Sequence, residues 1–211
     1  MKIVRGFIVC FSFLWSVTFE EAVASYERGE YIQALTSFYT LAKDDNAKAQ
    51  YNVALIYANG LAVPQDLSRA KRWYEKSARQ GNVKAQYNLA RLYHDKGANE
   101  PHAYQKAKYW YEKAIEGNVK DAYNNLGVLY LEGLGIPKNK QKAFELFKKG
   151  ASKGDSSAQV NLGVIYAWDK EITQDKMKAF ENFKKAIGSG KSEASHYLDK
   201  LCKESIWVCK E

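Results

Sequence analysis

A short motif, Ala-x-Tyr-Asn-Leu, recurs along this chain in four closely similar copies. The copies begin at Ala49, Ala85, Ala122 and Ala158, so they are spaced by 36, 37 and 36 residues. A fixed period of about 20–50 residues is typical of repeat proteins, in which each unit packs mainly against its neighbours. The period therefore predicts one elongated array, although a chain of 211 residues could by length form one large domain or two small ones.

Each repeat contains two segments with helical periodicity. In the first segment Ala49, Val53 and Tyr57 are four residues apart and share one helix face. In the second segment an alanine is followed four residues later by an aromatic residue, as Ala70–Tyr74, Ala107–Tyr111, Ala143–Phe147 and Ala179–Phe183. The small residues allow the two helices to approach closely and the rings fill the space between them, so each unit is predicted to be a helical hairpin.

Glycines and capping side chains mark the expected helix ends. Glycines that suit a positive φ follow the second segments at Gly81, Gly117, Gly154 and Gly190, and the first segments at Gly60 and Gly133. Repeat four has Asp169 where Gly60 and Gly133 end the first helices of their repeats, and we expect Asp169 to adopt the left-handed conformation. Expected N-caps of the second helices are Asp66, Asn139 and Asp175. Repeat two instead has Ala103 and one extra residue, so its loop from His94 to Tyr104 should be the least regular.

These residues resemble the Sel1-like repeat family, helical-hairpin relatives of the tetratricopeptide repeat. The resemblance is carried by Ala49-Gln50-Tyr51-Asn52-Val53-Ala54 with Tyr57 and Gly60, then Asp66, Ala70, Trp73-Tyr74-Glu75-Lys76 and Gly81, and it covers nearly all of Phe19 to Lys203. It implies an all-α fold, an α-solenoid of stacked antiparallel hairpins forming a right-handed superhelix. It also implies binding of proteins or peptides, commonly in bacteria and often outside the cytoplasm.

The expected organisation divides the chain into seven parts. A signal peptide occupies 1–18, a tetratricopeptide-like hairpin 19–45, four repeats 46–81, 82–117, 118–154 and 155–190, and a capping helix with its tail 191–211. The capping helix is expected over Glu193 to Lys203, where its charged residues suit an end unit on which nothing stacks.

The first eighteen residues have the layout of a secretory signal peptide. Lys2 and Arg5 precede an apolar run from Phe7 to Val17, which as a helix spans about 16 Å, well short of the roughly 30 Å hydrocarbon core. We therefore expect a periplasmic or secreted protein with no stable membrane span after processing; the alternative is an inner-membrane anchor formed by residues 6–18. Cleavage is expected near Thr18, which keeps the first helix whole, and the other candidate site follows Ala24.

Two cysteines, Cys202 and Cys209, remain once the signal segment containing Cys10 is removed. An even pair in an exported protein is consistent with a disulfide, but seven residues of continuous helix would separate the two Cα atoms by about 10 Å, so the chain must turn between them. The other interpretation is that Cys202 is a small buried side chain.

The sequence predicts no catalytic, metal or cofactor site. His94, His102 and His196 have no metal-ligand spacing and are expected at the surface. Ser68 and Lys71 match the Ser-x-x-Lys motif, but its companion motifs are missing. The match is therefore better explained by chance than by a hydrolase active site. Removal of Lys2 and Arg5 lowers the formal charge from +8 to +6, which modestly favours an acidic partner. Nucleic acid is not expected, and the sequence sets no oligomeric state.

A row of asparagines is the strongest candidate for a binding surface. If the first helices line the concave face, Asn52, Asn88, Asn125 and Asn161 stack into a ladder of amides that could hold an extended peptide backbone. The alternative is that each amide bonds a neighbouring helix and sets the repeat geometry. Further candidate binding residues make the N-terminal half basic and aromatic: Lys48, Tyr51, Lys84, Tyr87 and Arg91.

Three classes of function follow. An exported binding scaffold without enzymatic activity is favoured, and it predicts copurification of a partner. The enzymatic alternative is a hydrolase acting on cell-wall material. The third is a membrane-tethered regulator that retains its N-terminal segment.

Overall fold

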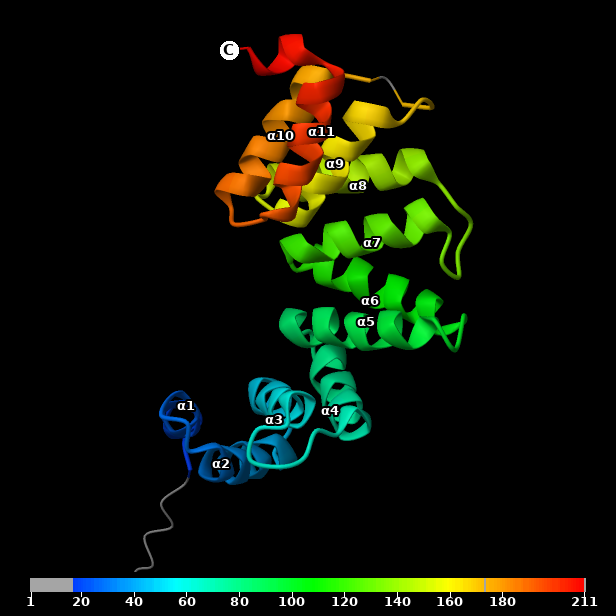
Figure 1. Ribbon diagram of the computed structural model, residues 1–211. Coiled ribbons are helices and arrows are strands. Elements are labelled where there is room, and N and C mark those ends of the chain that lie inside the picture. The colour runs from blue at the N-terminus through cyan, green and yellow to red at the C-terminus, as the bar shows by residue number, and fades with distance from the viewer. Residues whose placement is uncertain (1–16, 173, 211) are drawn as a thin grey trace, which may run out of the picture.

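The computed structural model describes residues 17–172 and 174–210 (Figure 1). These residues form eleven α-helices and one short 3-10 helix, with no strand among them. The helices are α1 (Phe19–Glu27), α2 (Tyr31–Lys43), α3 (Ala47–Asn59), α4 (Leu67–Arg79), α5 (Val83–Gly97), α6 (Ala103–Glu116), α7 (Lys120–Glu132), α8 (Lys140–Ser152), α9 (Ser156–Trp168), α10 (Lys176–Gly188), α11 (Glu193–Glu204) and the 3-10 helix η1 (Ile206–Cys209).

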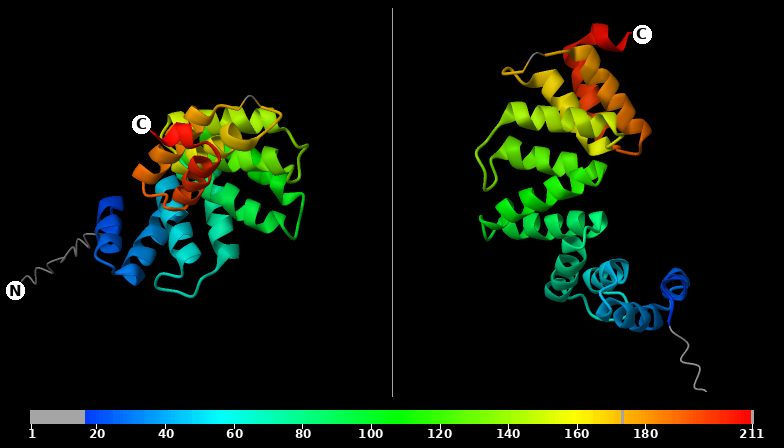
Figure 2. Two further views of the ribbon diagram at one scale, coloured as in Figure 1. Left: turned by 45° about the horizontal axis from the view of Figure 1, so that its top comes forward. Right: turned by 180° about the vertical axis from the view of Figure 1, so that it is seen from behind.

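Consecutive helices pair into antiparallel hairpins that stack in sequence order. Successive hairpins are turned relative to one another, so that the stack curves, and the two described ends of the chain lie at opposite ends of it (Figure 1, Figure 2). The predicted α-solenoid is confirmed; α1 and α2 form its first described hairpin, and α11 is its last α-helix.

Local side-chain caps begin most helices, as the sequence predicts. Asp66, Asn139 and Asp175 each accept a hydrogen bond from the backbone N–H three residues later and are confirmed as N-caps of α4, α8 and α10. Asn46 and Asn82 do the same for α3 and α5. Such a cap stabilises a helix by about 1 kcal/mol and fixes the residue at which it starts.

The prediction for Gly117 is wrong. Its φ is −84°, and the left-handed residue is the next one, Asn118, with φ of 63°. The extra residue of repeat two shifts the register, so that Asn118 takes the place of Gly81. Gly117 is required for a different reason, because a Cβ there would collide with the Val83 side chain at the start of α5.

The prediction for Asp169 is also wrong. Its backbone is extended, with φ of −74° and ψ of 126°, and its carboxylate accepts hydrogen bonds from the backbone N–H groups of Glu171 and Ile172 at 2.8 and 3.2 Å. Lys140 Nζ lies 3.3 Å from the same carboxylate. Asp can therefore end α9 through its side chain without entering the left-handed region.

The loop of repeat two is shorter than expected. α5 continues through His94 to Gly97, and α6 begins at Ala103 without a side-chain cap, so the connection is only 98–102. Backbone bonds from Ala103 to Glu100 and from Tyr104 to Pro101 close two tight turns there.

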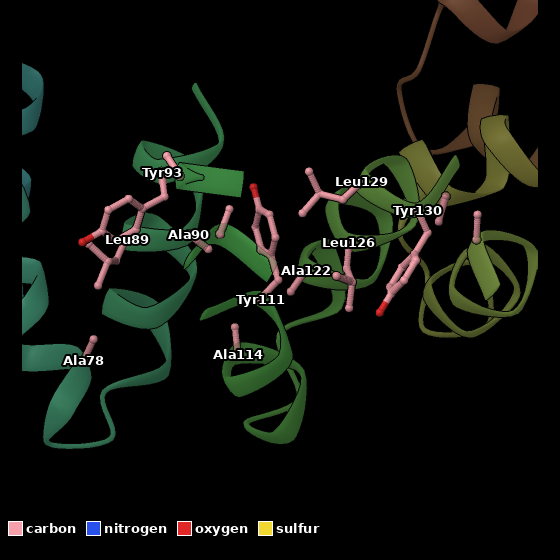
Figure 3. Packing of buried hydrophobic residues seen from close by; sticks show 14 of the residues in the cluster. Ala78, Leu89, Ala90, Tyr93, Tyr111, Ala114, Ala122, Leu126, Leu129 and Tyr130 are labelled. Atoms are coloured by element: carbon pink, nitrogen blue, oxygen red, sulfur yellow. The ribbon is translucent and has the colours of Figure 1, made fainter. Parts of the chain in front are cut away.

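Buried alanines and rings form the core, which divides into three clusters along the stack. The clusters span Ala22 to Ile56, Ala54 to Ile165 and Val160 to Val208, and α3 contributes to the first two. Tyr111 of α6 lies between Ala90 of α5 and Ala122 of α7 (Figure 3).

Repeats three and four replace the buried alanine–tyrosine pair of the earlier repeats by glycine and phenylalanine. A Cβ added to Gly127 would lie 2.5 to 3.0 Å from three ring carbons of Phe147, and Gly163 meets Phe183 in the same way. The equivalent positions in repeats one and two are Ala54 and Ala90. The missing methyl group therefore allows the phenylalanine ring to lie against the α7 or α9 backbone.

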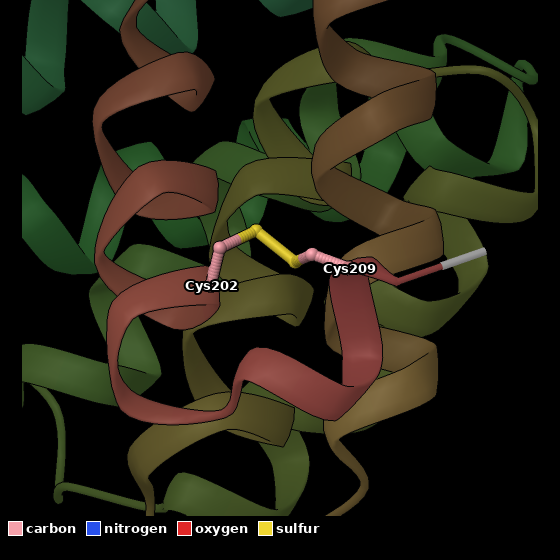
Figure 4. Close-up of a disulfide and its surroundings, with 2 residues drawn as sticks. All are labelled: Cys202 and Cys209. Atoms are coloured by element: carbon pink, nitrogen blue, oxygen red, sulfur yellow. A yellow bond between two sulfur atoms is a disulfide. The ribbon is translucent and has the colours of Figure 1, made fainter.

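The C-terminal tail turns back onto the last helix. Cys202 of α11 and Cys209 of η1 form a disulfide, with Cα atoms 5.6 Å apart (Figure 4). The turn that such a bridge requires lies at Ser205, between the two helices. Val208 is fully buried, whereas Ile206 and Trp207 are exposed.

Candidate functional site

The N-terminal ends of three first helices, α1, α3 and α5, meet at a groove of about 560 Å³, which we call the inner groove. Each of these ends is fixed by a cap: Thr18 forms a capping box with Glu21 at the start of α1, and Asn46 and Asn82 cap α3 and α5. The groove is lined by Phe19, Ala47, Lys48, Tyr51, Asn52, Gln80, Gly81, Asn82, Val83 and Lys84. Three local sequence signals thus set the position of one shared surface.

Hydrogen bonds between neighbouring helices hold the wall of the inner groove in place. Ser77 Oγ donates to the Ala47 carbonyl at 2.6 Å, and Gln80 Nε2 donates to Gln50 Oε1 at 2.8 Å. Gln50 is fully buried and donates in turn to the Ala42 carbonyl at 3.2 Å. Satisfied buried polar groups rigidify their surroundings, so the position of α3 relative to α2 and α4 is well defined.

The inner groove combines aromatic surface with positive charge. Lys48 Nζ lies 6.0 Å from the centre of the Phe19 ring, and the Tyr51 ring packs 5.9 Å from that of Tyr74. Partial burial raises the pKa of Tyr51, so its hydroxyl stays protonated and can both donate and accept a hydrogen bond. With Lys48 and Lys84 lining it, the groove offers two cations beside half-buried rings.

The structure brings together only some of the nine residues that the sequence proposes for binding. Lys48, Tyr51, Asn52 and Lys84 line the inner groove. Asn88 and Arg91 line a second hollow of about 300 Å³ farther along α5. The other three, Tyr87, Asn125 and Asn161, line neither of the two hollows.

The first two asparagines do not bond to one another. Asn52 Nδ2 donates to the Lys48 carbonyl of its own helix at 3.0 Å, and Asn88 Nδ2 donates to the Tyr74 hydroxyl at 3.3 Å. In both residues an amide N–H that a bound peptide would need as a donor is used within the protein.

The last two asparagines belong to a relay that crosses three repeats. Asn161 donates to Asn124 at 2.8 Å, Asn124 to Asn125 at 3.3 Å, and Asn125 to the Tyr87 hydroxyl at 3.2 Å. All four predicted asparagines are half-buried. For Asn88, Asn125 and Asn161 this geometry favours the interpretation that the amide joins neighbouring helices over that of a continuous peptide-binding ladder.

Sequence reasoning missed Phe19, Gln80 and Val83 as groove residues. Phe19 and Val83 are the first residues of α1 and α5. The residue directly after each N-cap was therefore the available signal, because the caps are recognisable in the sequence and these helix ends lie side by side.

His94 is not the surface residue that we expected. It lies within α5, half-buried, with its ring 5.6 Å from that of Tyr104 and its Nδ1 3.2 Å from the Tyr111 hydroxyl. Burial lowers the pKa of His94, which keeps the ring neutral. The histidine is part of the aromatic packing between α5 and α6.

Ser68 and Lys71 line one shallow hollow of about 320 Å³ on α4 and α5. No hydrogen bond joins them in the described part of the chain, and Lys71 Nζ instead lies 5.6 Å from the Tyr93 ring centre. In the same part of the chain no His, Cys, Asp and Glu side chains gather as a metal-binding group. None of the helices built from residues 17–172 and 174–210 has the length and apolar content required to cross a membrane.

Solved structures similar to this one include Sel1 repeat proteins. A Sel1 repeat protein from Oxalobacter formigenes is 31% identical over 88% of this chain and 75% of its own, with a TM-score of 0.75. The protein c5321, a protective antigen of uropathogenic Escherichia coli with an SLR fold, is 30% identical over 87% of this chain, with a TM-score of 0.79. This chain covers 42% of that antigen, less than half of its length.

A comparison with curated proteins finds no match. The model of the Sel1 repeat, however, matches four consecutive segments, residues 47–82, 83–119, 120–155 and 156–191. These segments begin one or two residues after the expected repeat boundaries. Because they cover well over half of the sequence, the chain belongs to the Sel1 repeat family.

Proposed function

We propose that this protein is an exported scaffold that binds acidic, aromatic-containing peptide segments of partner proteins in the inner groove. Sel1 repeat proteins typically act as protein-interaction scaffolds and are generally not enzymes. The observation that supports this assignment most directly is the inner groove itself, where Lys48 and Lys84 stand beside Phe19 and Tyr51. A peptide carboxylate would pair with the lysines while an aromatic side chain packs on the rings.

The start of α1 supports processing near Thr18 over processing after Ala24. The capping box uses Thr18 N and Oγ1 with Glu21, at 3.0 and 3.2 Å. Cleavage just before Thr18 keeps this cap and keeps Phe19 in the groove. Cleavage after Ala24 would remove Phe19 and most of α1. Mass spectrometry of the mature N-terminus distinguishes these products from a tethered form that retains residues 6–18.

Selection from a displayed random-peptide library tests the groove. The bait is the full chain, compared with a Lys48→Glu/Lys84→Glu variant and with Lys148→Glu/Lys149→Glu on α8 as a control of equal charge change. We expect acidic, aromatic-containing peptides that bind the wild type and the control alike and bind the groove variant at least about tenfold more weakly. Equal binding to all three proteins contradicts the assignment. Hydrolysis of cell-wall material by the purified protein would favour the enzymatic alternative.

A further inference from the structure

Positive charge is segregated onto one set of helices. The second helices of the hairpins, α2, α4, α6, α8 and α10, carry seventeen Lys and Arg against five Asp and Glu, a formal charge of +12. The first helices together with α11 carry seven basic and nine acidic residues, a formal charge of −2. The basic character noted in the sequence therefore belongs to the second helices and not to those that form most of the inner groove.

Two rows of cations run from repeat to repeat on the second helices. One row is Arg69, Lys106, Lys142 and Lys178, and the other, seven residues later in each helix, is Lys76, Lys113, Lys149 and Lys185. Residues seven apart share a helix face. The residue between the rows changes from Arg72 in α4 to Tyr109, Glu145 and Glu181, so the positive stripe is continuous only on α4.

A pocket of about 280 Å³ lies at this strongest point, and we call it the α2–α4 pocket. It is lined by Tyr39 of α2, Tyr57 of α3, and Arg69, Arg72, Trp73 and Lys76 of α4. It shares no lining residue with the inner groove.

Rings and cations in the α2–α4 pocket are ordered against one another. The Tyr39 and Trp73 rings meet edge to face at 5.5 Å, Lys76 Nζ lies 4.5 Å from the Trp73 ring, and the Arg69 guanidinium lies 5.5 Å from that of Tyr57. Stacking on a ring face holds a cation in position and leaves its N–H groups able to donate to an oxyanion. The pocket thus presents oriented donors rather than freely rotating side chains.

The cations of α4 have few intramolecular counter-charges. In the described residues neither Arg72 nor Lys76 forms an ion pair, and the only carboxylate of α4, Glu75, accepts a hydrogen bond from the Tyr93 hydroxyl at 2.7 Å. On α6, α8 and α10 some lysines pair with carboxylates, in Lys108–Glu112, Lys113–Glu116, Lys140–Glu171 and Lys178–Asp175. Among the described residues, the α2–α4 pocket therefore presents two cations without an ion pair, Arg72 and Lys76, beside Arg69, which pairs with Asp66 at 3.1 Å.

We propose that the α2–α4 pocket is a second binding site, which takes a short carboxylate-rich segment of a partner protein. Charge complementarity selects the acidic occupant, and the rings of Tyr39, Tyr57 and Trp73 provide apolar surface for its side chains. An extended polyanion or a lipid surface fits less well, because Glu145 and Glu181 interrupt the stripe on α8 and α10. The protein would then hold two acidic segments at once, one in the inner groove and one here.

Fluorescence anisotropy with a labelled synthetic peptide of Glu, Asp and one Phe tests the second site, with the Gln/Asn version of the peptide as a neutral control. The protein is the full chain carrying Lys48→Glu/Lys84→Glu, so that the inner groove does not contribute. Adding Arg72→Glu/Lys76→Glu is expected to weaken binding of the acidic peptide by about tenfold or more, since two charge-assisted contacts are lost. Adding Lys184→Glu/Lys185→Glu on α10, with the same charge change, should leave the affinity nearly unchanged.

Tyr39→Ala provides a second variant that keeps the charge. It should weaken binding of the Phe-containing peptide more than that of a peptide without Phe. Equal losses from the α4 and α10 charge reversals would overturn the proposal, because they indicate a diffuse electrostatic effect. A different result would assign the pocket to a membrane surface instead. In that case the protein would not bind the peptide but would bind vesicles of anionic phospholipid, and Arg72→Glu/Lys76→Glu would abolish the vesicle binding. Neither result depends on whether the inner groove binds peptides.

Discussion

Substitution of Gly127 by alanine is expected to destabilise the protein even though alanine is the better helix former. Gly127 lies within α7, where the exchange alone would gain about 0.8–1 kcal/mol. The new Cβ, however, would lie 2.5 to 3.0 Å from three carbons of the Phe147 ring, whereas carbon atoms in contact prefer about 3.5–4.0 Å. Phe147 is fully buried, so its ring cannot move out into solvent without loss of buried apolar area.

The magnitude follows from these opposing terms. Overpacking of this kind costs about 1–3 kcal/mol, so the net loss should be about 1 kcal/mol, or a fall in Tm of about 2–4 °C. Urea unfolding followed by circular dichroism measures this loss in the free energy of unfolding. Hydrogen exchange of the α7 and α8 amides shows whether the loss is local to these helices. Gly188→Ala is the matched control, because that glycine ends α10 with nothing within 4 Å of the added Cβ. It should stabilise by about 0.4–1 kcal/mol.

A double-mutant cycle separates the ring contact from other causes. Gly127→Ala should cost less in a Phe147→Leu background, since the smaller side chain leaves room for the new methyl group. If Gly127→Ala stabilises the wild-type protein as much as Gly188→Ala does, the ring is not held against α7 and the packing argument is refuted.

Three further measurements test other parts of the structure. Replacement of Cys202 and Cys209 by serine should cost about 2–2.5 kcal/mol by the chain-entropy model, seen as lost exchange protection in α11 and η1 only; a loss spread over the whole chain would contradict a local clamp. Burial raises the pKa of Tyr74 and Tyr111 above the ordinary value of about 10. Their contribution to stability is therefore complete below pH 10 and falls as the pH rises further. An ultraviolet titration in which both tyrosines ionise near pH 10 in the folded protein would contradict this prediction. Gln50→Ala should cost about 1–3 kcal/mol because it leaves buried partners unsatisfied, and an unchanged urea midpoint would show that water replaces the amide.

The repeats and most helix starts are predictable because their signals are local. A cap such as Asp66 bonds a backbone N–H only three residues away, so the interaction can be read from sequence. The role of Gly117 cannot be read in that way, since it depends on Val83, which is 34 residues earlier in the chain. The wrong prediction arose because one inserted residue moved the left-handed position to Asn118.

The candidate site is predictable only in part, for a related reason. The period places Lys48 and Lys84 at equivalent positions, and the structure puts both at the inner groove. Phe19 enters the groove only because the stack curves, which no single repeat encodes. Likewise, an asparagine amide faces a bound peptide or a neighbouring helix according to what the previous repeat supplies, such as the Tyr87 hydroxyl for Asn125.

The division of the core has a consequence for how the molecule opens. The leading hairpin packs with α3 in the first cluster, and α3 also contributes Ala54 to the central one. Local clusters of this kind can unfold separately, so residues 19–45 are expected to exchange their amides more readily than α5 to α8. The inner groove is lined by Phe19, which packs against the leading cluster, and by Tyr51, which packs against the central one. A peptide bound there would contact both clusters. Its binding would therefore make the unfolding of the N-terminal end of the solenoid more cooperative.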